Sequence, residues 1–165
     1  MSDAPKSMEL MEGQAYSLAF RTMAPRFNRL IWSYHWLQMA LYDEMLGTDD
    51  PADRRRAVDR AVDRFFTMQA DSVVVPTTMP MSAAIAPLFS ERYPEAAIVF
   101  DNLHALHDAV SDILASSMVP RSGKREAVHR ALSRYRDSTT SVTTRAEWRT
   151  MSVEMGASGM GGHVP

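Results

Sequence analysis

The stretch PRFNRLIWSYHWLQMALYDEML, residues 25–46, decides the fold class of this chain. Pro25 suits the first turn of a helix, where its missing N–H costs nothing, and Gly47 suits the position after a helix end. Apolar residues recur at helical spacing and predict a stripe that faces the core: Phe27, Leu30, Ile31, Tyr34, Leu37, Leu41 and Met45. The opposite side carries Trp32, Trp36 and Met39. Because a helix that is apolar on nearly all sides is buried, we expect these three residues to contact another copy of the chain or a protein partner.

Similar signals on either side of this stretch predict further helices. Asp50 and Pro51 form an N-cap followed by a first-turn proline, and Pro94 opens a later helix. The predicted fold is an all-α bundle with short accessory helices and four main helices, at about 25–46, 51–70, 94–118 and 123–137. The expected organisation is a loose leader at 1–12, a single domain at 13–155 and a flexible tail at 156–165.

Composition excludes several classes of function. The 165 residues include no cysteine, so disulfides, zinc–thiolate sites, iron–sulfur clusters and thiol catalysis are excluded. The net charge of −2 offers no field that attracts nucleic acid, and no apolar stretch is long enough to span a membrane. No secretion signal is evident, and we therefore expect a cytoplasmic protein. Motifs for a nucleophilic serine or a phosphate-binding loop are missing, so the sequence indicates no catalytic residue and no substrate class.

Three histidines are candidates for chemistry inside the bundle. His35 lies in the middle of the apolar helix, and His104 and His107 lie one turn apart in the helix at 94–118. If Val99, Leu103, Leu106, Val110 and Ile113 form the core stripe of that helix, His107 falls within the buried sector and His104 at its margin. Asp101 and Asp108 would then face water.

These positions lead to two hypotheses about function. The first is a protein that binds iron, copper or haem through His35, His104 and His107, with Glu44, Asp101 and Asp108 as auxiliary oxygen ligands. The second is a cofactor-free oligomerisation module built on the apolar central helix. An ordinary buried histidine, hydrogen-bonded to a carbonyl or carboxylate, is the alternative to a ligand.

One spacing resembles a known metal site. Asp101-x-x-His104 and Glu126-x-x-His129 resemble the Glu-x-x-His pairs of ferritin-like di-iron carboxylate bundles. The resemblance covers only these four residues, because the helix at 51–70 offers aspartates where that family supplies a glutamate. It is therefore a chemical analogy and assigns no family.

Methionine is abundant, with 13 residues, and some of it lies in the glycine-rich C-terminal segment. Met151, Met155, Met160 and His163 provide soft ligands that favour Cu(I). The alternative is a tail whose methionines are incidental. In either case we expect loss of residues 156–165 to leave stability nearly unchanged.

Overall fold

The computed structural model describes residues 17–71, 74–137, 141–154 and 156–164. Within these ranges every regular element is a helix, which confirms the all-α fold. The elements are α2 (Leu18–Met23), α3 (Pro25–Leu46), α4 (Pro51–Ala70), α5 (Ser82–Ile85), α6 (Pro87–Arg92), α7 (Pro94–Ala115), η1 (Arg121–Gly123), α8 (Lys124–Arg136), α9 (Arg145–Glu154) and η2 (Ser158–Met160). The predicted leader at 1–12 lies outside the described residues, and no described helix has both the length and the apolarity to cross a membrane.

Local sequence signals explain where the helices begin. The Asp50 side chain accepts hydrogen bonds from the backbone N–H groups of Ala52 and Asp53, at 2.9 and 2.8 Å, and so caps α4. Proline occupies the first turn of α3, α4, α6 and α7. Before α9, the Glu147 carboxylate accepts from the Thr144 N–H at 2.7 Å and the Thr144 hydroxyl accepts from the Glu147 N–H at 3.3 Å, which is the arrangement of a capping box.

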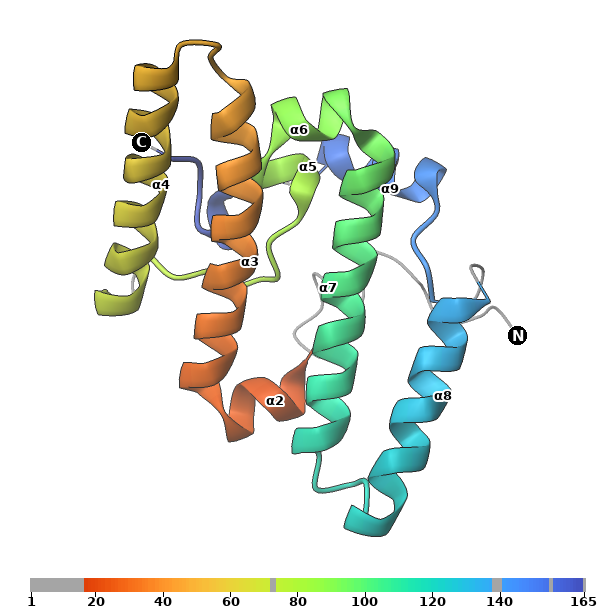
Figure 1. Cartoon of the computed structure of the whole chain (residues 1–165). Coiled ribbons are helices and arrows are strands. Elements are labelled where there is room, and N and C mark those ends of the chain that lie inside the picture. Colours follow the sequence, from red (N-terminus) through yellow and green to blue (C-terminus); the bar gives the residue numbers. More distant parts are fainter. Residues whose placement is uncertain (1–16, 72–73, 138–140, 155, 165) are drawn as a thin grey trace.

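The four long helices stand in a row, in the order α4, α3, α7 and α8 (Figure 1). Within this row α3 packs against α4 and α7 packs against α8, while the short α2 contacts both α3 and α7. The remaining short helices α5, α6 and α9 form a second layer against α3 and α7. Among the described residues the long helices therefore form a row that short helices cover on one side, and the expected four-helix bundle is not confirmed.

The core lies between this row and the second layer, and methionine is its most characteristic residue. Six methionines are buried in one hydrophobic cluster: Met39, Met68, Met79, Met81, Met151 and Met160. The unbranched thioether side chain fits irregular gaps between elements that cross at different angles. A core assembled from long helices, short helices and loop segments presents such gaps.

The prediction that Trp32, Trp36 and Met39 of α3 contact a partner is wrong. Trp32, Trp36 and Met39 are only 2%, 0% and 0% exposed and belong to the core of the chain itself. On the other side of α3, Phe27 and Tyr34, which were expected in the core, are 55% and 57% exposed. α3 is therefore rotated about its axis by roughly half a turn relative to the prediction, because the bulky indole side meets the second layer.

The C-terminal segment is also different from the prediction, because it packs into the core. Met160 is 2% exposed, and the Trp36 indole N–H donates to the Gly162 carbonyl at 2.8 Å. The Arg64 guanidinium donates to the Gly161 carbonyl at 3.1 Å. The backbone N–H of Thr77 donates to the Gly159 carbonyl at 2.8 Å. The tail is thus a strap that contacts α3, α4 and the segment before α5.

Gly161 is required for this close approach. Its φ of +97° lies in the region that favours glycine. A Cβ atom at this position would lie 2.8 Å from Met68 Cε and 3.1 Å from Trp36 Cδ1. The glycine-rich composition that suggested a flexible tail therefore lets the backbone pass directly over two core side chains.

We predict that deletion of residues 156–165 lowers the free energy of unfolding by at least about 3 kcal/mol, because it opens a cavity and leaves the buried Trp36 N–H without an acceptor. Urea denaturation followed by circular dichroism measures this change. As a matched pair, Met160→Ala should cost about 2–5 kcal/mol, whereas Met118→Ala, at a side chain that is 89% exposed, should change stability by less than about 0.5 kcal/mol. An unchanged denaturation midpoint after the deletion would contradict the packed strap.

Candidate functional site

The two central helices α3 and α7 run antiparallel and meet through a line of buried polar side chains. Asp101, His104 and Asp108 share one side of α7 because they are three and four residues apart. All three are buried, at 1%, 3% and 0% exposure. Trp32 of α3 bonds to Asp108 and His35 of α3 stacks on His104, while the Ser82 hydroxyl bridges Asp101 and Met39 of α3.

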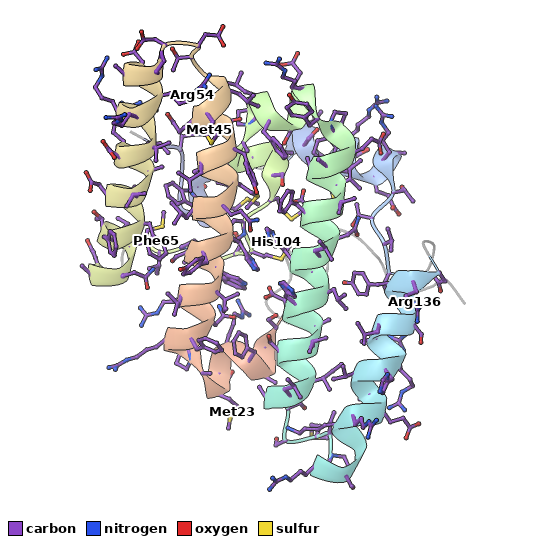
Figure 2. The ribbon with its side chains drawn as sticks, in the orientation of Figure 1. Met23, Met45, Arg54, Phe65, His104 and Arg136 are labelled. Atoms are coloured by element: carbon purple, nitrogen blue, oxygen red, sulfur yellow. The ribbon has the colours of Figure 1, made fainter. Side chains whose placement is uncertain are left out.

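The middle level of this line is a histidine cluster, defined as His35, His104 and His107. The rings of His35 and His104 stack with their centroids 3.7 Å apart and their planes only 7° from parallel. The ring of His107 lies 6.1 Å from that of His35, and the His107 side chain is exposed. Figure 2 shows His104 on the side of α7 that faces α3. The cluster therefore extends from the interior to the surface.

Burial keeps the two stacked imidazoles neutral. Loss of solvation, reinforced by the neighbouring His104 and His107, lowers the pKa of His35 to about 3. Loss of solvation, reinforced by His107, lowers the pKa of His104 to about 4. The Nδ1 atoms of His35 and His104 are buried and have no hydrogen-bond partner among the described residues. Such unpaired nitrogens are rare in a folded core and are competent to accept a proton, a hydrogen bond or a metal ion.

Two buried aspartates flank the cluster and bind indole groups. Asp101 accepts from the Trp148 indole N–H at 2.7 Å and from both the backbone N–H and the hydroxyl of Ser82, at 2.9 and 2.8 Å. Asp108 accepts from the Trp32 indole N–H at 2.8 Å and also interacts with the Ser17 hydroxyl and the Arg21 guanidinium. Burial raises the pKa of each carboxyl to about 6. Asp101 is therefore held by neutral donors, whereas Arg21 adds a favourable charge to the surroundings of Asp108.

The prediction for α7 is wrong about which residues are buried. His104 was expected at the margin and Asp101 and Asp108 in water, but all three are inside. His107, expected in the core, is exposed. The apolar stripe of α7 that was expected in the core lies on the exposed side of the helix, where Val99 is 57% exposed. Asp101 and Asp108 face inward because the indole N–H groups of Trp148 and Trp32 donate hydrogen bonds to them in the core.

The other predicted ligands are not part of the cluster. Glu44 lies near the end of α3 and pairs with Arg60 of α4, with 3.4 Å between Oε2 and Nη2. His129 and Glu126 are exposed on α8, and Glu126 pairs with Arg130. Among the residues that the structure describes, no group of three or more His, Asp or Glu side chains is arranged to hold a metal ion.

The C-terminal residues that suggested Cu(I) handling do not gather around one point. Met151 and Met160 are buried in the core, and His163 is exposed. Met155 lies outside the described residues. Two residues that bind Asp101, Ser82 and Trp148, were not predicted from the sequence. The sequence shows only that Asp101, His104 and Asp108 lie on one side of a helix, as their spacing of three and four residues requires. It does not show which distant residues bind them.

We predict that Asp108→Asn and Asp101→Asn differ in stability, because Asp101 accepts from N–H donors on both oxygens, whereas the second partner of Asp108 is the Ser17 hydroxyl, which can also accept a hydrogen bond. Asp108→Asn keeps the acceptor for Trp32 and removes a buried charge, so it should stabilise the fold at pH 7–8 by about 1–2 kcal/mol. Asp101→Asn directs an N–H toward a donor and should be less stable than Asp108→Asn by about 1–3 kcal/mol.

The pH dependence of this effect has a definite sign. The folded pKa of Asp108, about 6, lies above the ordinary value of 3.8 for an aspartate. The contribution of Asp108 to stability therefore falls as the pH rises from about 4 to 6, because this carboxyl holds more protons in the folded state than in the unfolded state. The lowered pKa values of His35 and His104 act in the opposite direction in wild type and variant alike, so the comparison of the two isolates Asp108. The advantage of Asp108→Asn should be largest above pH 6 and should fade toward pH 4, as measured by urea denaturation across this range. An advantage independent of pH would contradict the buried charge.

Comparison with known proteins provides no relative from which a role could be transferred. No protein-family model matches the chain. Searches of curated proteins and of solved structures likewise give no match. The function is therefore argued from the histidine cluster and its surroundings.

Proposed function

We propose that this chain binds a transition-metal ion at the histidine cluster between α3 and α7. The observation that carries the proposal is the pair of buried Nδ1 atoms, on His35 and His104, that lack a hydrogen-bond partner among the described residues. A core histidine with only a structural role normally donates or accepts hydrogen bonds through both ring nitrogens. Exposed His107 beside His35 offers a third imidazole and a route of entry from the surface.

The donor set favours copper or zinc over iron. Imidazole nitrogens dominate the cluster, and nitrogen sites bind Cu²⁺ and Zn²⁺ more tightly than Fe²⁺. Asp101 has hydrogen bonds on both oxygens, and Asp108 interacts with Trp32, Ser17 and Arg21, so neither aspartate is included in the proposed site. Glu44, paired with Arg60, is not included in the proposed site.

The stacked geometry argues against haem bound by both inner histidines. The rings of His35 and His104 are in face-to-face contact, with 3.7 Å between their centroids, and a porphyrin does not fit between them. A single ion is small enough, but each lone pair lies in the plane of its own ring. The rings must therefore turn out of their parallel stack when an ion binds, with nitrogen–metal distances of about 2.0–2.1 Å.

We predict that the purified protein binds Zn²⁺ or Cu⁺ with a stoichiometry of one and that His35→Phe and His104→Phe abolish this binding. Phenylalanine retains an aromatic ring in the core but has no nitrogen ligand. His129→Phe, at an exposed position on α8, is the control and should bind as the wild type does. Isothermal titration calorimetry measures the affinity, and elemental analysis of the isolated complex measures the stoichiometry. Unchanged binding by both cluster variants would disprove this site.

The proposal also predicts an unusual pH dependence. Because the pKa values of His35 and His104 are about 3 and 4, both rings are already neutral at pH 5.5. An imidazole of ordinary pKa is about 90% protonated at that pH and loses about tenfold in affinity. Binding should therefore release no proton from His35 or His104 between pH 5.5 and 8. Calorimetry in buffers of different ionisation enthalpy counts the released protons, and a release of about two protons at pH 5.5, as expected for two imidazoles of ordinary pKa, would contradict the assigned ligands.

A further inference from the structure

The side of the helix row that no other described element covers is strongly apolar. We define the open face as the exposed stripes of α3 and α7, with Phe27, Tyr34 and Met45 on α3 and Val99, Leu103 and Leu114 on α7. These side chains are between 47% and 57% exposed. Within each helix the intervals are 4, 7 or 11 residues, which places the three side chains on one side. The opposite sides of both helices share one core cluster, so both stripes face away from it.

The open face carries almost no charge. Between Leu30 and Tyr42, α3 contains no Lys, Arg, Asp or Glu. After Glu95, the only charged residues of α7 are Asp101, Asp108 and Asp112, of which the first two are buried on the opposite side and Asp112 accepts a hydrogen bond from the backbone of Phe20. Soluble monomers rarely expose contiguous apolar patches of more than a few hundred Å².

From these observations we infer that the open face is the interface of a symmetric homodimer. α3 and α7 each have 22 residues and are therefore about 33 Å long. Two neighbouring helices, each about 10 Å wide, present roughly 650 Å² per copy. Two copies together bury about 1,300 Å², which lies within the range of stable interfaces, about 1,200–2,000 Å².

A second copy fits the open face better than a lipid surface does. In a two-fold dimer the same patch meets itself, so an apolar face without charges creates no repulsion between like groups. Helices that lie on a membrane surface are instead rich in Lys and Arg on the polar side. α7 contains neither residue, and α3 contains none after Arg29.

The dimer also closes the histidine cluster. His107 is exposed and lies next to Leu103 and Leu106 on the outer side of α7, while its ring is 6.1 Å from that of buried His35. A second copy on the open face covers His107 and separates the cluster from water. This inference rests on the exposed side chains and stands whether or not the cluster binds a metal ion.

The first test is the mass of the metal-free protein in solution. Sedimentation equilibrium at about 100 µM, well above the Kd of a micromolar interface, should give twice the 18.5 kDa of one chain. A monomer at this concentration would overturn the inference. A monomer that also floats with phosphatidylcholine vesicles would identify the face as a lipid-binding surface instead.

Substitutions locate the interface. Val99→Glu combined with Leu103→Glu should convert the dimer to a monomer with unchanged helicity, because it buries like charges at the centre of the face. Val153→Glu, at an α9 side chain that is 86% exposed away from the open face, should leave the dimer intact. A dimer that survives the double substitution would place the interface elsewhere and overturn the inference.

The lack of cysteine permits an independent measurement that does not depend on introducing charge. A single thiol from Leu103→Cys should become less reactive toward maleimide as protein concentration rises, because dimer formation covers it. A thiol from Met118→Cys, at a side chain that is 89% exposed, should react at the same rate at every concentration. Equal behaviour of the two thiols would contradict burial of Leu103 in a dimer.

Discussion

Two buried carboxylates on α7 require hydrogen-bond donors, and the rest of the structure depends on this requirement. Asp101 and Asp108 lie on one side of the helix, and an ionised carboxylate without partners in a core costs several kcal/mol. Trp148 and Trp32 supply indole N–H groups from α9 and α3, at 2.7 and 2.8 Å. These two bonds fix the rotation of α7 about its own axis and its level relative to α3.

This rotation has two consequences on opposite sides of α7. Toward the interior it brings His104 against His35, in a stack that leaves both Nδ1 atoms without a hydrogen-bond partner among the described residues. Toward the outside it leaves Val99 and Leu103 exposed. The proposed metal site and the inferred dimer interface therefore have one structural origin. His107 joins them, because it belongs to the cluster and lies on the outer side.

The second structural feature is the C-terminal strap, which completes the core from the far end of the chain. Trp36, at the centre of α3, donates to the Gly162 carbonyl, and Met160 enters the methionine cluster. Since α3 receives partners from α4, α7 and the strap, its inner side is buried within one chain. Its outer side, with Phe27 and Tyr34, is exposed among the described residues.

The sequence by itself determined the helices and the residues of the histidine cluster. Proline at the first turn and the Asp50 cap act over a few residues, so the bounds of α3 and α4 followed from local chemistry. The tertiary structure alone decided which side of each helix is buried. α3 and α7 are apolar on more than one side, and periodicity then gives no unique direction. The donors that settle the direction, Trp32 for Asp108 and Trp148 for Asp101, are 76 and 47 residues away along the chain, beyond the reach of any local pattern.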